Sequence, residues 1–267
     1  MSFFEAIVLG TVQGITEFLP ISSTAHLFLV PWLLGWPPHS FSFDVALHLG
    51  TLVALLIYFR KDWLSLGSSA LDFLRGRHYD PLILYIIAAT IPAGIAGLLL
   101  EDIVEHQLRD PRIMAATLIV LALVLAVAEK VGRRKKDLKQ MTFADAMVIG
   151  FAQCIALIPG VSRSGVTMTA ALFREMKREH AARFSFYLST PVIGGAVTKK
   201  LFDVAQTGLP PGETGPFVLG IVVSGVVGFA AIKFLLRYLQ NHNTFLFIYY
   251  RIALGIVVYL AFSTGFR

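Results

Sequence analysis

Two polar stretches, TEFLPISSTAH at residues 16–26 and LIPGVSRSGVT at residues 157–167, interrupt apolar segments of the chain. A helix that runs into proline must usually end, because proline lacks the amide proton and its ring clashes with the preceding turn. The serines that follow each proline can cap a new helix. Each stretch therefore predicts a helix, a tight loop and a second helix, forming hairpins over about 3–35 and 143–173.

The amino-acid composition indicates that lipid, rather than water, surrounds these hairpins. Of 267 residues, 56% are hydrophobic and 15% are charged, and the mean hydropathy is +0.70. An ordinary soluble domain has about 25% charged residues, so this chain has too few to cover a water-soluble globule. We predict a single integral membrane domain over residues 1–267. Irregular backbone at membrane depth must be buried in protein or line a cavity, so the two hairpins are expected to be re-entrant.

Six uninterrupted apolar runs are long enough to cross the hydrocarbon core, which takes about 20 residues. Together with the two hairpins they predict an all-α polytopic integral membrane protein with about six full transmembrane helices. The runs lie at about 44–59, 81–100, 113–129, 180–198, 216–236 and 244–263.

The lysine and arginine residues predict which side of the membrane each loop faces, because short cytoplasmic loops are enriched in them. Sixteen of the 23 fall on one side of the predicted topology and five on the other, while Arg163 and Arg251 lie within apolar segments. Both termini are then extracytoplasmic, and the first hairpin enters from outside. The same distribution argues against nucleic acid as a partner, which would need a basic face. The sixteen lie in segments 60–80, 130–140 and 174–183 and at Lys233 and Arg237.

An internal repeat relates the two hairpins. Three residues of the first recur 140 residues later in the second, and each hairpin precedes three predicted spans. Because three is an odd number, the second copy must be inverted, which is a plan of transporters with a site at the repeat interface. We predict two inverted-topology repeats, over about 1–131 and 141–267. The matched pairs are Gly10 with Gly150, Gln13 with Gln153 and Ser22 with Ser162.

The first break collects polar groups that are costly at membrane depth. Glu17 lies one turn from Gln13 on the same helix face, and an ionisable group there marks a functional site unless the hairpin is shallow enough for it to reach water. Ser23 and His26 share a face at spacing i+3, which suits a nucleophile with a base or an acid. The alternatives are a capping role for Ser22 and a structural role for His26.

The second break is suited to an anion. Gly160 permits close approach of the backbone, the amides that start the next helix point into the loop, and Arg163 adds a forked, permanent charge. Two such helix N-termini with an arginine, hydroxyls and a histidine predict a phosphate or diphosphate cradle inside the membrane. The alternative is a structural Arg163 that snorkels or pairs with Glu17. The hydroxyls of this break are Ser162, Ser164 and Thr167.

The pattern Gln13-x-x-x-Glu17 followed by LPISSTAH, with PGVSRSGVT at residues 159–167, resembles the undecaprenyl pyrophosphate phosphatases of the BacA type. The resemblance covers essentially the whole chain. It implies hydrolysis of undecaprenyl diphosphate to undecaprenyl phosphate and inorganic phosphate in the bacterial plasma membrane. That reaction regenerates the lipid carrier of cell-wall synthesis, and the resemblance implies a site open to the outer face.

The residues and the resemblance together assign four catalytic residues and seven that bind the diphosphate. The nucleophile is open between Ser23 and His26; Ser23 is favoured, with His26 as acid and base. The expected catalytic residues are Glu17, Ser23, His26 and Arg163, and the expected diphosphate-binding residues are Gln13, Ser22, Thr24, Gly160, Ser162, Ser164 and Thr167.

A divalent cation, magnesium or calcium, is implied by the resemblance only, with Glu17 as the candidate ligand. Gln13 stands where many members of the family have glutamate. The change removes a charge and counts against a cation site that needs two carboxylates. The expected partners are a polyprenyl diphosphate and the lipid bilayer, and a homodimer is left open.

A lipid-carrier transporter or flippase is the main alternative, because inverted repeats with broken helices are the usual architecture of transporters. Two other enzyme classes fit less well. Type 2 phosphatidic acid phosphatases predict a histidine six residues after the arginine, where this chain has Thr169, and prenyl-transfer enzymes need aspartate-rich DDxxD motifs, which do not occur. Release of phosphate from a prenyl diphosphate would separate a hydrolase from a transporter.

Overall fold

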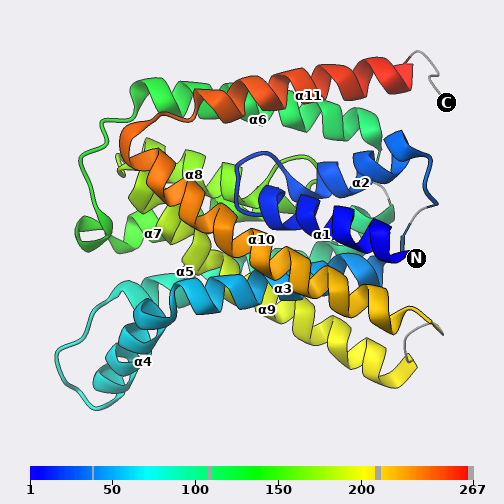
Figure 1. Cartoon of the computed structure of the whole chain (residues 1–267). Coiled ribbons are helices and arrows are strands. Elements are labelled where there is room, and N and C mark those ends of the chain that lie inside the picture. The colour runs from blue at the N-terminus through cyan, green and yellow to red at the C-terminus, as the bar shows by residue number, and fades with distance from the viewer. Residues whose placement is uncertain (38, 107–109, 208–211, 264–267) are drawn as a thin grey trace.

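The computed structural model describes residues 1–37, 39–106, 110–207 and 212–263. These residues form eleven α-helices and two short 3₁₀ helices, and their only β pairing is an isolated bridge between Lys136 and Met176. Figure 1 shows the helices gathered into one bundle. They are α1 (Phe3–Thr16), α2 (Ser23–Leu34), α3 (Phe41–Tyr58), α4 (Arg60–Leu74), α5 (Leu82–His106), α6 (Pro111–Val131), η1 (Leu138–Gln140), α7 (Phe143–Cys154), η2 (Ile155–Leu157), α8 (Arg163–Phe173), α9 (Arg178–Thr207), α10 (Thr214–Asn241) and α11 (Phe245–Ser263).

Both predicted hairpins are confirmed. The α1 helix ends at Thr16, just before the Glu17–Ile21 loop, and α2 begins at Ser23. In the second hairpin α7 continues into η2, the chain breaks at Pro159, and α8 begins at Arg163. These helices are shorter than a bilayer crossing, as expected for segments that enter the bundle and turn back.

The described residues include four helices that are long and apolar enough to cross a membrane: α5, α6, α10 and α11. A fifth candidate is the pair of α3 and α4, which bend by 76° at Phe59. The sequence predicted six spans, and the remaining one, at 180–198, corresponds to part of α9. Proline and hydroxyl side chains interrupt the apolar run of α9, so it does not qualify by composition. The chain is an all-helical, multi-pass membrane protein.

The α4 helix was not predicted, because residues 60–80 were interpreted from their basic residues only as a cytoplasmic loop. Its apolar residues follow a helical repeat among charged ones, with Leu66 buried and Leu64 and Leu71 exposed. This amphipathic pattern is typical of a helix at an interface rather than across a membrane. In Figure 1, α4 extends from the end of α3 at one end of the bundle.

Glycine allows each hairpin to pack closely against a long helix. A Cβ atom on Gly10 of α1 would lie 2.9 Å from the carbonyl oxygen of Gly220 in α10. A Cβ atom on Gly150 of α7 would clash with the backbone of Ala89 in α5. Small residues at membrane helix contacts let the backbones approach in this way. The two hairpins are thus fixed against α10 and α5 respectively.

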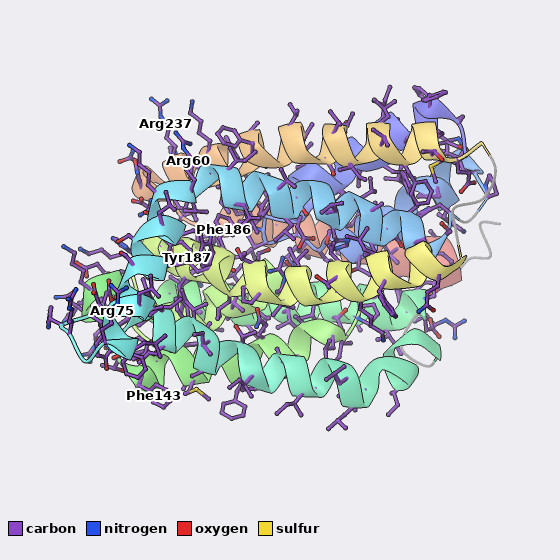
Figure 2. All side chains as sticks on the ribbon, turned by 90° about the horizontal axis from the view of Figure 1, so that it is seen from below. Arg60, Arg75, Phe143, Phe186, Tyr187 and Arg237 are labelled. Carbon is purple, nitrogen blue, oxygen red and sulfur yellow. The ribbon has the colours of Figure 1, made fainter. Side chains whose placement is uncertain are left out.

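Basic side chains concentrate at one end of the bundle. Figure 2 shows Arg60, Arg75 and Arg237 at the end opposite to the start of α1 in Figure 1. Two buried carboxylates pair with basic residues of the loops counted above. Glu129 binds Arg134 and Arg178, and Asp145 binds Lys136 at 2.9 Å and Arg174 at 2.6 Å.

Candidate active site

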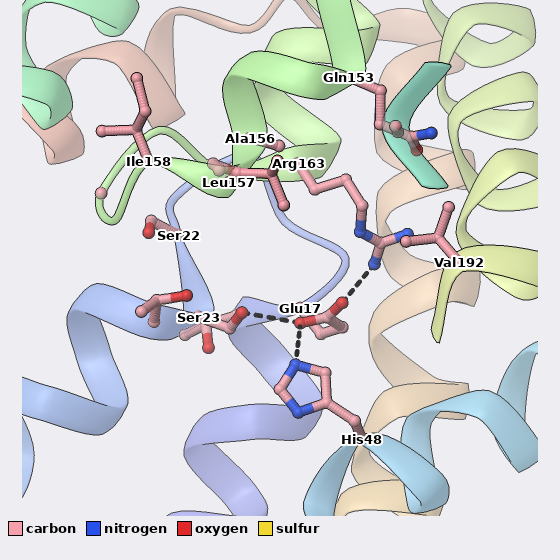
Figure 3. A pocket seen from close by; sticks show the side chains of 15 residues that line it. Glu17, Ser22, Ser23, His48, Gln153, Ala156, Leu157, Ile158, Arg163 and Val192 are labelled. Carbon is pink, nitrogen blue, oxygen red and sulfur yellow. Dashed lines mark hydrogen bonds and ion pairs between the residues drawn. The ribbon is translucent and has the colours of Figure 1, made fainter. Parts of the chain in front are cut away.

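The two helix breaks meet around one cavity of about 200 Å³. Its polar wall comes from the two breaks and from α3, and its apolar wall from α5, α9 and the η2 segment. Seven of the eleven predicted site residues line it, as Figure 3 shows for several. The seven are Glu17, Ser22, Ser23, Thr24, Gly160, Ser162 and Arg163.

The centre of the site is an ion pair between the breaks. Arg163, the first residue of α8, donates from Nη2 to Oε1 of Glu17, the residue that caps α1. Glu17 is 6% exposed, and the side chain of Arg163 is 14% exposed. The predicted pairing is therefore present, and it joins residues 146 positions apart. An ionised carboxylate at this depth requires such a partner.

The second oxygen of Glu17 accepts two further hydrogen bonds from the first hairpin. Ser23 donates its hydroxyl to Oε2 at 2.7 Å, and Gln13 donates its amide nitrogen at 3.1 Å. The predicted patch of Gln13 and Glu17 one helical turn apart is confirmed. The hydroxyl proton of Ser23 already points at a carboxylate that can accept it.

His48 of α3 is a further residue in contact with Glu17. No role was assigned to it from the sequence. Its Nε2 lies 3.5 Å from Oε2 of Glu17, and its Nδ1 lies 2.7 Å from the carbonyl oxygen of Asp44. Because both ring nitrogens face oxygen acceptors, the ring is fully satisfied only when both carry a proton. A histidine inside an apolar run was the available signal, but the sequence could not show that α3 lies against the break.

His26 is placed differently from the sequence prediction. Its Nδ1 lies 2.7 Å from the carbonyl oxygen of Ser22 and its Nε2 2.7 Å from the hydroxyl of Tyr250, whose ring stacks on the imidazole. Neither Ser23 nor Glu17 is among its hydrogen-bond partners in the part of the chain that the structure describes. The expected Ser23–His26 pair is therefore not formed, because the ring turns toward α11 instead of following the helix face.

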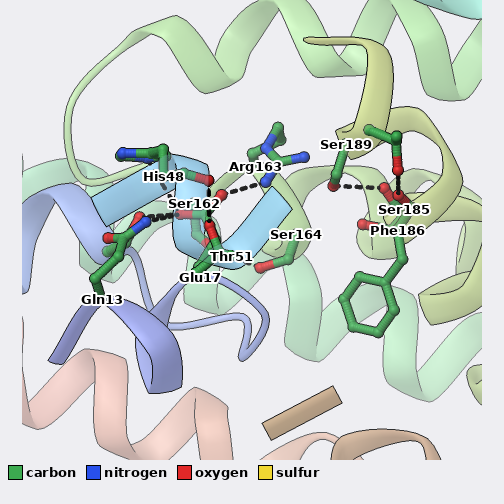
Figure 4. A network of polar contacts seen from close by, with 12 residues as sticks. Gln13, Glu17, His48, Thr51, Ser162, Arg163, Ser164, Ser185, Phe186 and Ser189 are labelled. Atoms are coloured by element: carbon green, nitrogen blue, oxygen red, sulfur yellow. Dashed lines mark hydrogen bonds and ion pairs between the residues drawn. The ribbon is translucent and has the colours of Figure 1, made fainter. Parts of the chain in front are cut away.

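The remaining predicted residues mostly shape the loops. Ser22 and Ser162 cap α2 and α8 through their hydroxyls, which accept from the amides of Ala25 and Gly165. Ser164 donates to the carbonyl of Leu19 at 3.0 Å and so ties the second break to the first. The hydroxyl of Thr167 lies 2.7 Å from that of Ser185 of α9, and Thr167 is not among the residues that line the cavity. Figure 4 shows Ser185 in the polar network beside Arg163.

Arg251 of α11 contacts the main chain of both helix breaks. No role was assigned to it from the sequence. It is 1% exposed and donates to main-chain carbonyls on every side. Its Nη1 lies 3.2 Å from the carbonyl of Pro20, while Nη2 lies 3.2 Å from that of Gly160 and 3.0 Å from that of Val161. Carbonyls that the broken helices leave without an intrahelical donor are satisfied in this way.

The donor set around Glu17 does not fit a divalent cation held by protein groups. Glu17 is the only carboxylate of the cavity wall within the described residues, and its two oxygens already accept from Arg163, Gln13 and Ser23. No group of three or more His, Cys, Asp or Glu residues in that part of the chain is placed to hold a metal. Calcium and magnesium need several oxygen ligands, and Gln13 supplies no second carboxylate.

The geometry suits a phosphate group. The N-termini of α2 and α8 open on the cavity, hydroxyls line it, and Arg163 keeps a buried Nη1 with no partner among the described residues. Helix N-termini and a guanidinium are standard ligands of phosphates. Fold and site together define a multi-pass membrane protein with a polar pocket, suited to an anion, between two broken hairpins.

Comparison with known proteins identifies the family. The family model described as "Bacitracin resistance protein BacA" matches residues 6–257, and the chain belongs to that family. Among curated relatives, the undecaprenyl-diphosphatase of Thermodesulfovibrio yellowstonii is 49% identical over 261 residues, covering 97% of both chains. That of Geobacter metallireducens is 47% identical over 264 residues, covering 97% of this chain and 98% of the relative.

Proposed function

We propose that this protein is an integral membrane phosphatase that hydrolyses undecaprenyl diphosphate to undecaprenyl phosphate and inorganic phosphate. The reaction recycles the lipid carrier of bacterial cell-wall synthesis. Full-length relatives named for this activity support it. The single observation that carries the chemistry is the hydrogen bond of 2.7 Å from Ser23 to Glu17, beside Arg163.

In the proposed reaction, Oγ of Ser23 attacks the terminal phosphorus and its proton passes to Oε2 of Glu17. The bond from that phosphorus to the bridging oxygen breaks, and undecaprenyl phosphate leaves with the electron pair and takes the proton from Glu17. Water then attacks the phosphoserine, its proton is accepted by Glu17, and inorganic phosphate departs as Ser23 regains a proton. Arg163 and the amides at the two helix N-termini stabilise the charge of the transferred phosphoryl group.

Ser23 is favoured over His26 as the nucleophile because of their surroundings. Ser23 has a proton acceptor at 2.7 Å and lines the cavity, whereas both nitrogens of His26 are bonded to Ser22 and Tyr250. His48 holds Glu17 from the other side. The catalytic role that the sequence predicts for His26 stays a prediction.

Two measurements test the proposal. Purified wild-type protein in detergent should release phosphate from undecaprenyl diphosphate, and Ser23→Ala, Glu17→Ala and Arg163→Ala should each abolish most of the release. Brief incubation with substrate labelled at the terminal phosphate, followed by a quench with denaturant at mildly alkaline pH so that phosphoserine and phosphohistidine both survive, should leave label on Ser23. Label on His26 would contradict the assignment of the nucleophile. The relatives are named for hydrolysis, so lipid transport is not proposed.

The two halves of the chain are proposed to be inverted repeats, over about 1–131 and 141–267, with six crossings formed by α3, α5, α6, α9, α10 and α11. Three observations support this proposal. Helices α1 and α7 begin 140 residues apart, as do α2 and α8. The packing of α1 on α10 has a counterpart in that of α7 on α5. The same plan would place the site between the repeats.

Both termini and the mouth of the site are proposed to face outward. The gathering of Arg60, Arg75 and Arg237 at the opposite end supports this orientation. The single cysteine makes the test simple: in a Cys154→Ser background, Arg112→Cys should react with an impermeant maleimide in cells with a permeabilised outer envelope but an intact plasma membrane, and Lys135→Cys should not. Labelling at position 135 and not at position 112 would show that the protein has the opposite orientation in the membrane. The homodimer stays a prediction.

A further inference from the structure

A buried glutamine in the cavity has no use in the mechanism above. Gln153 lies in the last turn of α7, is 2% exposed and lines the cavity. Neither its amide nitrogen nor its amide oxygen has a hydrogen-bond partner among the residues that the structure describes. A buried amide left unpaired is costly, and native proteins rarely keep one without a reason. Both atoms point to a ligand that brings polar partners.

The repeat explains why Gln153 is free. Its counterpart Gln13 donates to Glu17, one helical turn later. The residue 140 positions after Glu17 is Leu157, so the second hairpin has an apolar residue where the first has the carboxylate that Gln13 binds. The first hairpin therefore supplies Glu17 and Ser23, and the second supplies Arg163 and an amide without a partner among the described residues.

The layout of the cavity places that amide on the far side of Arg163 from Ser23. Figure 3 shows Ser23, Glu17 and the guanidinium of Arg163 in that order across the pocket, with Val192 and Gln153 beyond. Arg163 bonds Glu17 through Nη2, and its buried Nη1 is free of partners within the described residues. The cavity wall also includes the apolar side chains of Ala93, Leu157 and Val192.

We infer that Gln153 binds the phosphate that is attached to the lipid, by donating its amide protons to that phosphate next to Nη1 of Arg163. This inference rests on the proposed function. The terminal phosphate then lies beside Ser23, and the first isoprene units lie along the apolar wall. A water held with the ligand satisfies the amide oxygen. Gln153 is a specificity-determining residue that separates a lipid phosphate from a free phosphate.

Binding of the two products separates their subsites without any turnover. Farnesyl monophosphate carries the lipid-attached phosphate, and inorganic phosphate represents the released one. Gln153→Met keeps the size of the side chain and removes its hydrogen bonds. Calorimetry in detergent should show that Gln153→Met binds farnesyl monophosphate at least about tenfold more weakly than wild type does, as expected for a lost hydrogen bond to a charged group. Inorganic phosphate should bind within about twofold of its wild-type affinity.

Two controls make the outcome decisive. Gln240→Met makes the same change at an exposed site in α10 and should alter neither affinity. Farnesol, which has the tail without a phosphate, should bind Gln153→Met as it binds wild type. Unchanged affinity for farnesyl monophosphate, or equal losses for both phosphate ligands, would overturn the inference; Gln153→Asn substitutes if the Met variant does not fold. Absence of phosphate release by wild-type protein would instead contradict the proposed function and leave these binding results standing.

Discussion

Ser22 and Ser162 share one uncommon backbone conformation, with φ and ψ of 76° and 98° at Ser22 and 70° and 110° at Ser162. Non-glycine residues avoid positive φ, and holding one there costs about 1–3 kcal/mol. Each serine uses its hydroxyl to cap the helix that follows, through the amide three residues later. The strained turn aims both helix N-termini at the cavity.

Replacing Ser162 by glycine should destabilise the protein less than replacing it by alanine. Both changes remove the cap, but only glycine relieves the positive φ, so we expect a difference of about 1 kcal/mol in the free energy of unfolding. Denaturant titration in detergent measures it. Thr142 caps α7 at an ordinary φ of −102°, so glycine should be favoured over alanine there only by its general N-cap preference, and by less than at Ser162. An equal advantage of glycine at both positions would show that strain at Ser162 is unimportant.

Replacing Arg163 by lysine should strongly lower the rate of turnover, although the positive charge is kept. One guanidinium nitrogen binds Glu17 and the other is free for a phosphate, whereas an ammonium group cannot serve both in a fixed plane. We expect kcat/KM to fall by at least about 100-fold, the loss typical of a transition-state donor. Phosphate release from undecaprenyl diphosphate gives the rate, and a melting curve shows that the variant is folded. Near-normal hydrolysis would contradict the assigned role of Arg163.

A cation site should be created by Gln13→Glu. Wild-type protein without substrate is expected to show no saturable binding of Mg²⁺ or Ca²⁺ below millimolar concentrations, because Glu17 is the only carboxylate among the described residues that line the cavity and is already bonded. A second carboxylate one turn away adds a ligand and a charge, and should tighten binding by about tenfold. Titration calorimetry measures both. Gln153→Glu, in the hairpin without a counterpart of Glu17, should gain nothing comparable. Tight binding of either cation by wild type would contradict the conclusion that the site does not fit a divalent cation.

The two imidazoles should differ in their effect on turnover. His48 contacts Glu17 and lines the cavity, so His48→Gln is expected to lower kcat by about tenfold or more, the scale of a positioned proton-transfer partner. Tyr250→Phe removes only the hydroxyl that holds His26, and kcat should stay within about threefold of wild type. If His26 is the acid and base, the order of the two effects will be reversed.

Acid should remove the stabilising effect of Asp145, which lies at the basic end of the bundle. Burial raises the pKa of this carboxyl, but hydrogen bonds from Lys136, Thr142 and Arg174 outweigh burial and hold the pKa at about 2, below the ordinary 3.8. The ionised form therefore contributes about 2 kcal/mol above pH 4, which is lost as the pH falls toward 2. Denaturant titration of wild type and Asp145→Asn should show this gap closing in acid. Asp72→Asn, in an exposed pair with Arg77, should show no such gap at any pH.

Sequence reasoning recovered what lies close along the chain. Pro20 and Pro159 marked the breaks because proline ends helices by its own chemistry. Gln13 and Glu17 were paired by helical spacing alone. The Glu17–Arg163 pair was also predicted, because two buried opposite charges in matched breaks have few other partners.

The contacts that were missed join segments far apart in the sequence. His26 was paired with Ser23 on its own helix, but Tyr250, 224 residues away, takes its Nε2. Arg251 was noted in an apolar segment and His48 was given no role, and the roles of both depend on which helix packs behind each break. Helical spacing cannot supply that information. The count of six spans stays a prediction, because α9 is long enough to cross a membrane but not apolar enough to qualify by composition.

The carbonyl-bound Arg251 also affects the charge balance of the membrane interior. Glu17 neutralises Arg163, but Arg251 has no carboxylate partner among the described residues. The empty site therefore carries an excess of at least one positive charge in a medium that screens charge poorly, and a second when His48 carries both of its ring protons. An anionic headgroup that enters compensates this charge, whereas a neutral or zwitterionic lipid does not. The excess positive charge of the empty site is thus compensated only when a negatively charged substrate binds.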